Sequence, residues 1–197
     1  MNKQKQKRTN AASARTRKLI ENTFVEILHE KGRVDLVNVT ELVKRAQICR
    51  STFYKHFPNV KAVVLAIKEE LVQEFCQNAQ SAANKTAGEV YFDKIYQFVK
   101  RNDKFFRLIL NTDDSVMMVI DMSKIYKDSF CKLLKTDKEI VNRKLLDVEV
   151  STLCDGCALQ IIRYYRGETK ASLKEIITSA KMSYENLHRW RSHEPTK

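Results

Sequence analysis

The chain has 197 residues, 43% of them hydrophobic, so it can bury a sizeable core in one or two domains. Its 36 Lys and Arg exceed its 24 Asp and Glu by 12, and its five cysteines are an odd number. This cysteine count excludes a disulfide framework, and no apolar run has the length of a signal peptide or a membrane span. We therefore expect a cytoplasmic protein with reduced thiols.

The scarcity of helix-breaking residues indicates the fold class. Only four Gly and two Pro occur, whereas the helix formers Lys, Glu, Leu and Ala are common. No alternation of apolar and polar residues is long enough to predict a sheet. The sequence therefore predicts an all-α protein.

The N-terminal residues predict a basic arm followed by a helix. Residues 1–14 hold four positive charges and no acidic residue, and the first ten have nothing to pack. We expect a disordered arm, which is either a solvated tail or a segment that reaches nearby phosphates. A helix is expected over residues 11–31, ended by Gly32. Its predicted buried stripe contains Leu19, Ile20, Phe24, Ile27 and Leu28. The link that follows is expected to bury Val34 and Leu36.

Residues 38–57 contain two short helical patterns around a tight turn. Glu41 follows Asn38 at the spacing of a capping box, in which the Glu41 side chain returns to the Asn38 amide. The second helix begins near Arg50 and buries Phe53 and Phe57. Its outward residues are expected to be Arg50, Ser51, Thr52, Tyr54 and Lys55. This pattern is typical of a helix-turn-helix motif whose second helix enters the DNA major groove.

The excess charge is concentrated in the same part of the chain. Residues 1–61 hold 14 Lys and Arg against 5 Asp and Glu, whereas the other 136 residues carry a net charge of only +3. A basic segment that contains a helix-turn-helix pattern favours a nucleic-acid partner.

Further helices are predicted after a turn at Pro58. A long helix is expected from residue 60 to about 78, with Ala62, Val63, Leu65, Ala66, Leu71, Val72 and Phe75 on its apolar face. Later helices are expected at about residues 89–102, 103–111, 114–135, 138–166 and 172–190. Ser172 and Glu175 repeat the capping-box spacing at the start of the last helix.

This arrangement resembles the tetracycline-repressor-like (TetR/AcrR) family of bacterial regulators over about residues 14–72. The resemblance is carried by Leu42-Val43, Ala46, Ile48, Thr52-Phe53-Tyr54, His56 and Phe57. It implies an all-helical homodimer in which residues 1–60 form the arm and a three-helix DNA-binding domain. Residues 61–197 would form a helical domain that dimerises and often binds a small effector. The close of the chain is similar to a subtype whose last two helices pair as a four-helix bundle.

The resemblance also implies contacts to double-stranded DNA. It makes Arg50 to Lys55 the recognition helix, and it places Thr40 and Tyr54 near phosphate and His56 at the helix end. The fork of the Arg50 side chain matches the O6 and N7 atoms of guanine. The predicted DNA-binding residues are Thr40, Arg50, Ser51, Thr52, Tyr54, Lys55, His56 and Lys61.

Three positions depart from the family pattern. Gln47 stands where Gly is usual, so a positive φ there would cost about 1 kcal/mol. Cys49 replaces the usual Ser at the cap of the recognition helix. Val60 replaces a common Lys, with Lys61 beside it.

The candidate effector and cysteine sites each have two interpretations. Aromatic and methionine side chains of the C-terminal half either line an effector cavity or form ordinary core. The predicted pocket residues are Phe105, Phe106, Met117, Met118, Met122 and Tyr126. Cys154 and Cys157 are expected to be small core residues rather than a metal or redox pair. Cys49 is a substituted cap or a regulatory thiol.

Together these features predict a dimeric transcriptional regulator, a repressor, that binds a palindromic operator and is released by a small-molecule effector. No catalytic residues, metal ligands or cofactor are expected, and no membrane partner. Two alternatives stay open. One is a cysteine-based redox or metal-responsive regulator, and the other is an adaptor of the same fold whose partner is a protein.

Overall fold

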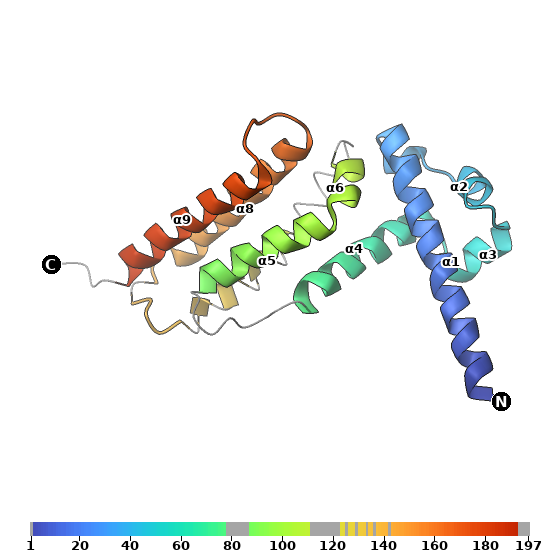
Figure 1. The fold of residues 1–197 in the computed structure, drawn as a ribbon, viewed down its shortest axis with the longest axis horizontal. Helices are drawn as coiled ribbons and strands as arrows, with labels where there is room; N and C mark the ends of the chain where they lie inside the picture. The colour runs from blue at the N-terminus through green and yellow to red at the C-terminus, as the bar shows by residue number, and fades with distance from the viewer. Residues whose placement is uncertain are drawn as a thin grey trace.

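The computed structural model describes residues 2–77, 87–110 and 123–192, except for positions 125, 129, 133, 136 and 142. For residues 2–10, 77 and 87 it describes the backbone alone. Every regular element in these ranges is helical, which confirms the all-α prediction (Figure 1). The elements are α1 (Asn2–Lys31), the 3₁₀ helix η1 (Val34–Leu36), α2 (Val39–Arg45), α3 (Arg50–His56), α4 (Val60–Gln77), α5 (Ala87–Arg101), α6 (Asp103–Ile109), α8 (Leu146–Tyr165) and α9 (Leu173–Arg191).

The helices form two groups joined by α4. Helices α1, α2 and α3 pack together at one end, and α9 packs along both α5 and α8 at the other (Figure 1). Helix α4 runs from the first group toward the second, and α6 contacts α1. The α1–α6 contact includes a hydrogen bond of 2.8 Å in which His29 Nδ1 donates to the Leu108 carbonyl. The two groups are therefore connected through packing as well as through the chain.

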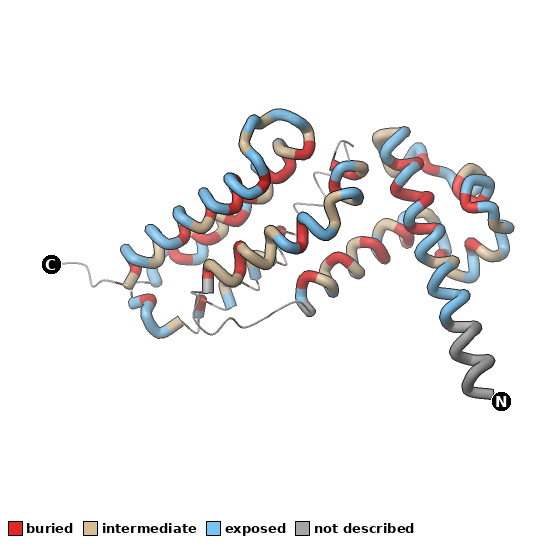
Figure 2. Tube along the Cα trace, viewed as in Figure 1, coloured by how far each residue is buried: buried red, intermediate tan, exposed pale blue. Residues whose placement is uncertain are grey.

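The first group is built around a shared apolar core. The core side chains from α1, α2, α3 and the residue after α3 are almost fully buried, and they include Ile20, Phe24, Ile27, Leu42, Phe53 and Phe57 (Figure 2). At the start of α2 the Asn38 side chain accepts a hydrogen bond of 2.9 Å from the Glu41 amide, as predicted. The predicted return bond from the Glu41 side chain to the Asn38 amide is wrong, because the Glu41 carboxylate pairs with Lys31 and Arg45 instead.

Helix α1 begins nine residues earlier than predicted, so the expectation of a disordered arm over residues 1–10 is wrong from Asn2 onward. Residues 2–10 contain no Gly or Pro, and Lys, Gln and Arg favour helix. Extending a helix that is already nucleated costs far less than starting one. The backbone therefore continues the helix even though these residues add no apolar stripe.

Three leucines predicted to be buried are exposed, and the helix geometry explains each case. Leu19 is 44% exposed because it lies at the edge of the stripe, where Thr23 takes the inner position. Leu65 is 58% exposed because the buried stripe of α4 repeats every four residues from Val63 to Phe75, and Leu65 lies two residues past Val63, on the other side of the helix. Leu36 is half exposed because the turn of η1 directs Val37 into the core instead.

The helix predicted over residues 138–166 begins only at Leu146. Ile140 is buried, and the Val141 amide donates to the Arg191 carbonyl at 3.1 Å, so tertiary contacts hold this segment as a loop. Leu145 then takes a left-handed φ of 65° just before the helix. Most of the helix predicted over residues 114–135 lies outside the described residues, whereas the described positions from 123 to 135 are helical.

Close packing holds α9 against α5. A Cβ added to Gly88 would lie 1.9 Å from the Tyr184 ring, so glycine is needed where these helices meet. The predicted capping box of the last helix is confirmed, with both the Ser172 and the Glu175 hydrogen bonds formed. In the described part of the chain, no helix has the length and apolar character needed to cross a membrane.

Candidate nucleic-acid interface and interior cavity

Helix α3 is fixed by the two phenylalanines on its inner side. Phe53 and Phe57 are 0% and 2% exposed, and their ring centroids lie 6.1 Å apart. Because these rings fill one side of a two-turn helix, the other side must face outward. There Arg50, Ser51, Tyr54 and Lys55 are exposed, and Thr52 and His56 are half-buried. The structure thus leaves four of the six predicted α3 residues exposed.

The turn between α2 and α3 has the strained backbone that its sequence implied. Gln47 takes a φ of 53°, the left-handed region that favours glycine. The turn is held by a hydrogen bond of 3.0 Å from the Ile48 amide to the Val43 carbonyl, and Ile48 packs partly against the core. These contacts offset a backbone cost of about 1 kcal/mol at Gln47.

Cys49 caps α3 without a side-chain hydrogen bond to the backbone amides. Its Sγ lies 3.1 Å from Ser51 Oγ and 2.9 Å from Thr52 Oγ1. Hydrogen bonds from these two hydroxyls, first Ser51 and then Thr52, lower the pKa of the exposed Cys49 thiol to about 7. Three polar side chains at the start of α3 therefore interact with one another.

Ion pairs separate the cations of the first group into two kinds. Arg45 holds Glu30 through two contacts of 2.6 Å, which fasten α2 to α1. Lys18 bonds Glu70 at 2.7 Å, and Arg33 bonds Asp35 at 2.9 Å. These cations are neutralised within the fold and serve its assembly.

Other cations of the first group have no ion-pair partner among the described residues, and three of these lie on or next to α3. Arg50, Lys55 and Lys61 are exposed, and none of them has an ion-pair partner among the described residues. Lys61 is in the first turn of α4, just beyond α3, and Tyr54 is 51% exposed between Arg50 and Lys55 in the chain. Thr40, in the first turn of α2, is also exposed. This positive surface, with its hydroxyl groups, can accept an anionic partner.

An apolar cavity of about 70 Å³ lies in the second group. The predicted pocket residues Phe106 and Tyr126 line it, together with Phe75, Tyr91, Phe98, Cys154 and Cys157. Burial raises the pKa of the Tyr126 hydroxyl, which has no hydrogen-bond partner in the described residues. A space of this size holds about two waters, so a larger ligand would need side chains to move.

The remaining predicted pocket residues are not brought together there. Phe105 lines a different cleft of about 500 Å³ between α1, α4, α5 and α6, where Lys18, Glu70 and Arg101 give it a polar wall. Met117, Met118 and Met122 lie outside the described residues. Phe75 was predicted on the apolar face of its helix but left out of the predicted pocket, although the four-residue spacing of buried side chains continues to it.

Cys154 and Cys157 are core residues. Both are 6% exposed, and burial raises the pKa of each thiol to about 12. Tyr91 lies beside them, with its hydroxyl 3.9 Å from Cys154 Sγ. At neutral pH both thiols are protonated and pack as small apolar side chains.

Comparison with known proteins gives one partial relative. No protein-family model matches the chain. The chain is 29% identical over 77 residues to an uncharacterized HTH-type transcriptional regulator, YxbF, of Bacillus subtilis (strain 168). The match covers 39% of this chain and 18% of the relative, so the chain spans less than a fifth of that protein's length. The likeness is therefore to one segment of a longer regulator.

Proposed function

We propose that this protein is a DNA-binding transcriptional regulator that reads DNA with α3. The observation that carries the proposal is the set of unneutralised cations, Arg50, Lys55 and Lys61, around the exposed Tyr54. Phosphate contacts supply most of the affinity of a DNA-binding protein, and free cations on a rigid helix suit that role. The partial relative supports the same function, because it is named an HTH-type transcriptional regulator.

The α3 side chains divide by the DNA groups that they can reach. Arg50, at the start of the helix, can form two hydrogen bonds to a guanine edge. Ser51 and Thr52 offer hydroxyls to bases or phosphates. Tyr54, Lys55, Thr40 and Lys61 suit the backbone, where they set the register of the helix without reading sequence. His56 is half-buried at the end of α3 and supports that end.

The finer proposal is a homodimer of the TetR/AcrR type on a palindromic operator. Two-fold symmetry would present two α3 helices about 34–36 Å apart, one turn of DNA. Residues 61–197 would form the dimerising domain, with the proposed boundary at the start of α4. Exposed apolar side chains on α8 and α9 support this assignment, and they include Val148, Leu159 and Met182.

We further propose that the protein is a repressor released by a small-molecule effector, with α4 as the connection. Helix α4 has 18 residues and is about 27 Å long. Its start is capped beside α3 by Asn59, whose side chain accepts from the Ala62 amide at 2.9 Å. Near its other end, Phe75 lines the interior cavity. A ligand that repacks Phe75 can tilt α4 and shift α3, provided that it binds one arrangement more tightly.

The function is tested by selecting bound sequences from random double-stranded DNA with the full chain. We expect a two-fold symmetric consensus whose binding weakens as salt rises. Recovery of no consensus, with no gel shift at low salt, would favour the protein-adaptor alternative. Ligands that bind the chain but never alter its operator affinity would contradict the effector switch.

A second candidate function is a thiol-responsive form of the same regulator. It is favoured by the exposed Cys49, whose thiol pKa of about 7 gives a substantial thiolate fraction at neutral pH. Cys49 lies next to Arg50 in the chain, so a bulky adduct there would obstruct the proposed DNA surface. Loss of operator binding on thiol modification, prevented by Cys49→Ser, would support this candidate.

A further inference from the structure

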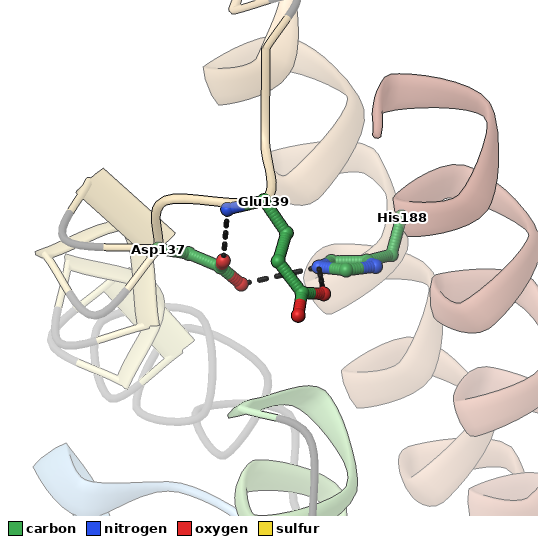
Figure 3. A group of neighbouring side chains, drawn as sticks. All are labelled: Asp137, Glu139 and His188. Carbon is green, nitrogen blue, oxygen red and sulfur yellow. Dashed lines mark hydrogen bonds and ion pairs between the residues drawn. The ribbon is translucent and has the colours of Figure 1, made fainter. Parts of the chain in front are cut away.

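Three side chains with metal-ligating atoms meet at the C-terminal end of α9. Asp137 and Glu139 belong to the segment before α8, and His188 lies in the last turn of α9 (Figure 3). Asp137 Oδ2 is 3.1 Å from His188 Nε2, and Glu139 Oε2 is 3.9 Å from the same nitrogen. One such atom from each residue lies within 4.8 Å of the other two.

The segment that carries the two carboxylates is held firmly against its surroundings. Arg143 donates to the Leu134 carbonyl at 3.0 Å and to the Asp137 carbonyl at 2.6 Å. The Val141 amide donates to the Arg191 carbonyl at 3.1 Å, and Ile140 is buried. These contacts order the backbone around Asp137 and Glu139, so the position of the carboxylates does not depend on their own contact with His188.

Hydrogen bonding also orients the imidazole. The Ser192 hydroxyl donates to the His188 carbonyl at 2.9 Å, and the same oxygen lies 3.4 Å from His188 Nδ1. Nε2, on the other side of the ring, forms a hydrogen bond of 3.1 Å with Asp137 Oδ2. Two carboxylates therefore face the same ring nitrogen, an arrangement in which one cation can contact all three side chains.

We propose that Asp137, Glu139 and His188 bind a divalent transition-metal cation, with Zn²⁺ as the probe. One imidazole and two carboxylates suit Zn²⁺ and similar ions, whereas Mg²⁺ and Ca²⁺ prefer oxygen ligands alone. Bonds of about 2.0–2.2 Å to one tetrahedral ion place its ligand atoms about 3.3–3.6 Å apart.

The observed separations are close to those that the ion needs. The 3.1 Å between Asp137 and His188 is a few tenths of an ångström below this separation, and the 3.9 Å to Glu139 is a few tenths above it, so rotation of the Glu139 side chain closes the larger gap. That side chain is 77% exposed, so it can turn freely, and water can fill the remaining positions of the ion. The bound ion would fasten the segment before α8 to the end of α9. This site is separate from α3 and does not rest on the proposed function.

The test measures Zn²⁺ binding to the full chain by calorimetry, after chelator treatment and removal of the chelator. We expect saturable binding whose Kd weakens at least about tenfold in both Glu139→Gln and His188→Gln. The matched control is Glu185→Gln, which removes an exposed carboxylate from the same helix and should leave Kd unchanged. Because Glu139 is exposed, its variant should keep the helical circular dichroism of the parent.

A second probe separates this site from the cysteines. Co²⁺ bound by nitrogen and oxygen ligands gives no thiolate charge-transfer absorption. We therefore expect Co²⁺ to bind this site of the parent without such absorption, and Glu139→Gln to weaken that binding. A Kd for Zn²⁺ unchanged by Glu139→Gln and His188→Gln would overturn the proposal. Absence of saturable binding would also overturn it and leave the hydrogen bond between His188 and Asp137 as a contact of the fold alone.

Discussion

The ring centroid of Phe75, on α4, lies 4.0 Å from that of Tyr126, deep in the second helical group. The same Phe75 ring meets Phe98 edge-on at 5.5 Å. Phe75 thereby joins α4, which begins beside α3, to the interior cavity and to α5. Packing at one aromatic residue thus connects the proposed DNA-reading helix to the part of the molecule where a ligand would be sensed.

Replacing Phe75 should test how much of the stability depends on this contact. Because the side chain is 2% exposed, Phe75→Ala leaves a cavity and should lower the free energy of unfolding by about 3–5 kcal/mol. Leu65→Ala is the matched control, since Leu65 is on the same helix and 58% exposed; it should change stability by less than about 1 kcal/mol. Urea denaturation measures both, and equal losses would contradict the packing described for α4.

Arg50→Ala should weaken operator binding by about 1–3 kcal/mol and relax the preference at one base position. Tyr54→Phe should weaken binding to all sequences alike, because a phosphate contact carries no sequence information. The control is Lys174→Ala, which removes an exposed cation from α9. Quantitative gel shifts on the selected operator and its point variants measure these effects. An Arg50 variant with the parent's affinity and preference would show that α3 is not the reader.

The cysteines should differ in reactivity because their thiol pKa values differ. Only the thiolate reacts, and its fraction rises with pH and reaches one half at the pKa. Alkylation of Cys49 should therefore rise through pH 7, where its lowered pKa lies. Cys154 and Cys157, with pKa values of about 12 and buried side chains, should stay unmodified in the folded protein. Peptide mass spectrometry after iodoacetamide at pH 6 to 8.5 resolves these sites; modification of Cys154 first would contradict the prediction.

Two glycines in helices should respond oppositely to alanine. Gly88→Ala places a Cβ 1.9 Å from the Tyr184 ring and should destabilise the protein by about 1–3 kcal/mol. Gly156→Ala, on α8, adds a Cβ with nothing within 4 Å and should stabilise by about 0.5–1 kcal/mol through helix propensity. Thermal unfolding should therefore shift in opposite directions. A Gly88 variant as stable as the parent would mean that α5 and α9 do not pack this closely.

The sequence by itself determined the local elements. Asn38 and Ser172 cap their helices as predicted, and Gly32 ends α1 with a left-handed φ of 76°. Phe53 and Phe57 are buried as their helical spacing indicated. These features depend on hydrogen bonds and side-chain periodicity within a few residues, which a sequence shows directly. The roles assigned to the α3 side chains in DNA binding stay predictions.

Only the tertiary structure decided which side chains far apart in the chain meet. Arg45 is neutralised by Glu30, whereas Arg50 is not, and no local pattern distinguishes these two arginines. The segment before α8 is a loop because Val141 bonds to Arg191, 50 residues later. His188 meets Asp137 for the same reason, across 51 residues. Such contacts arise when packed helices bring their surfaces together, so local spacing cannot reveal them.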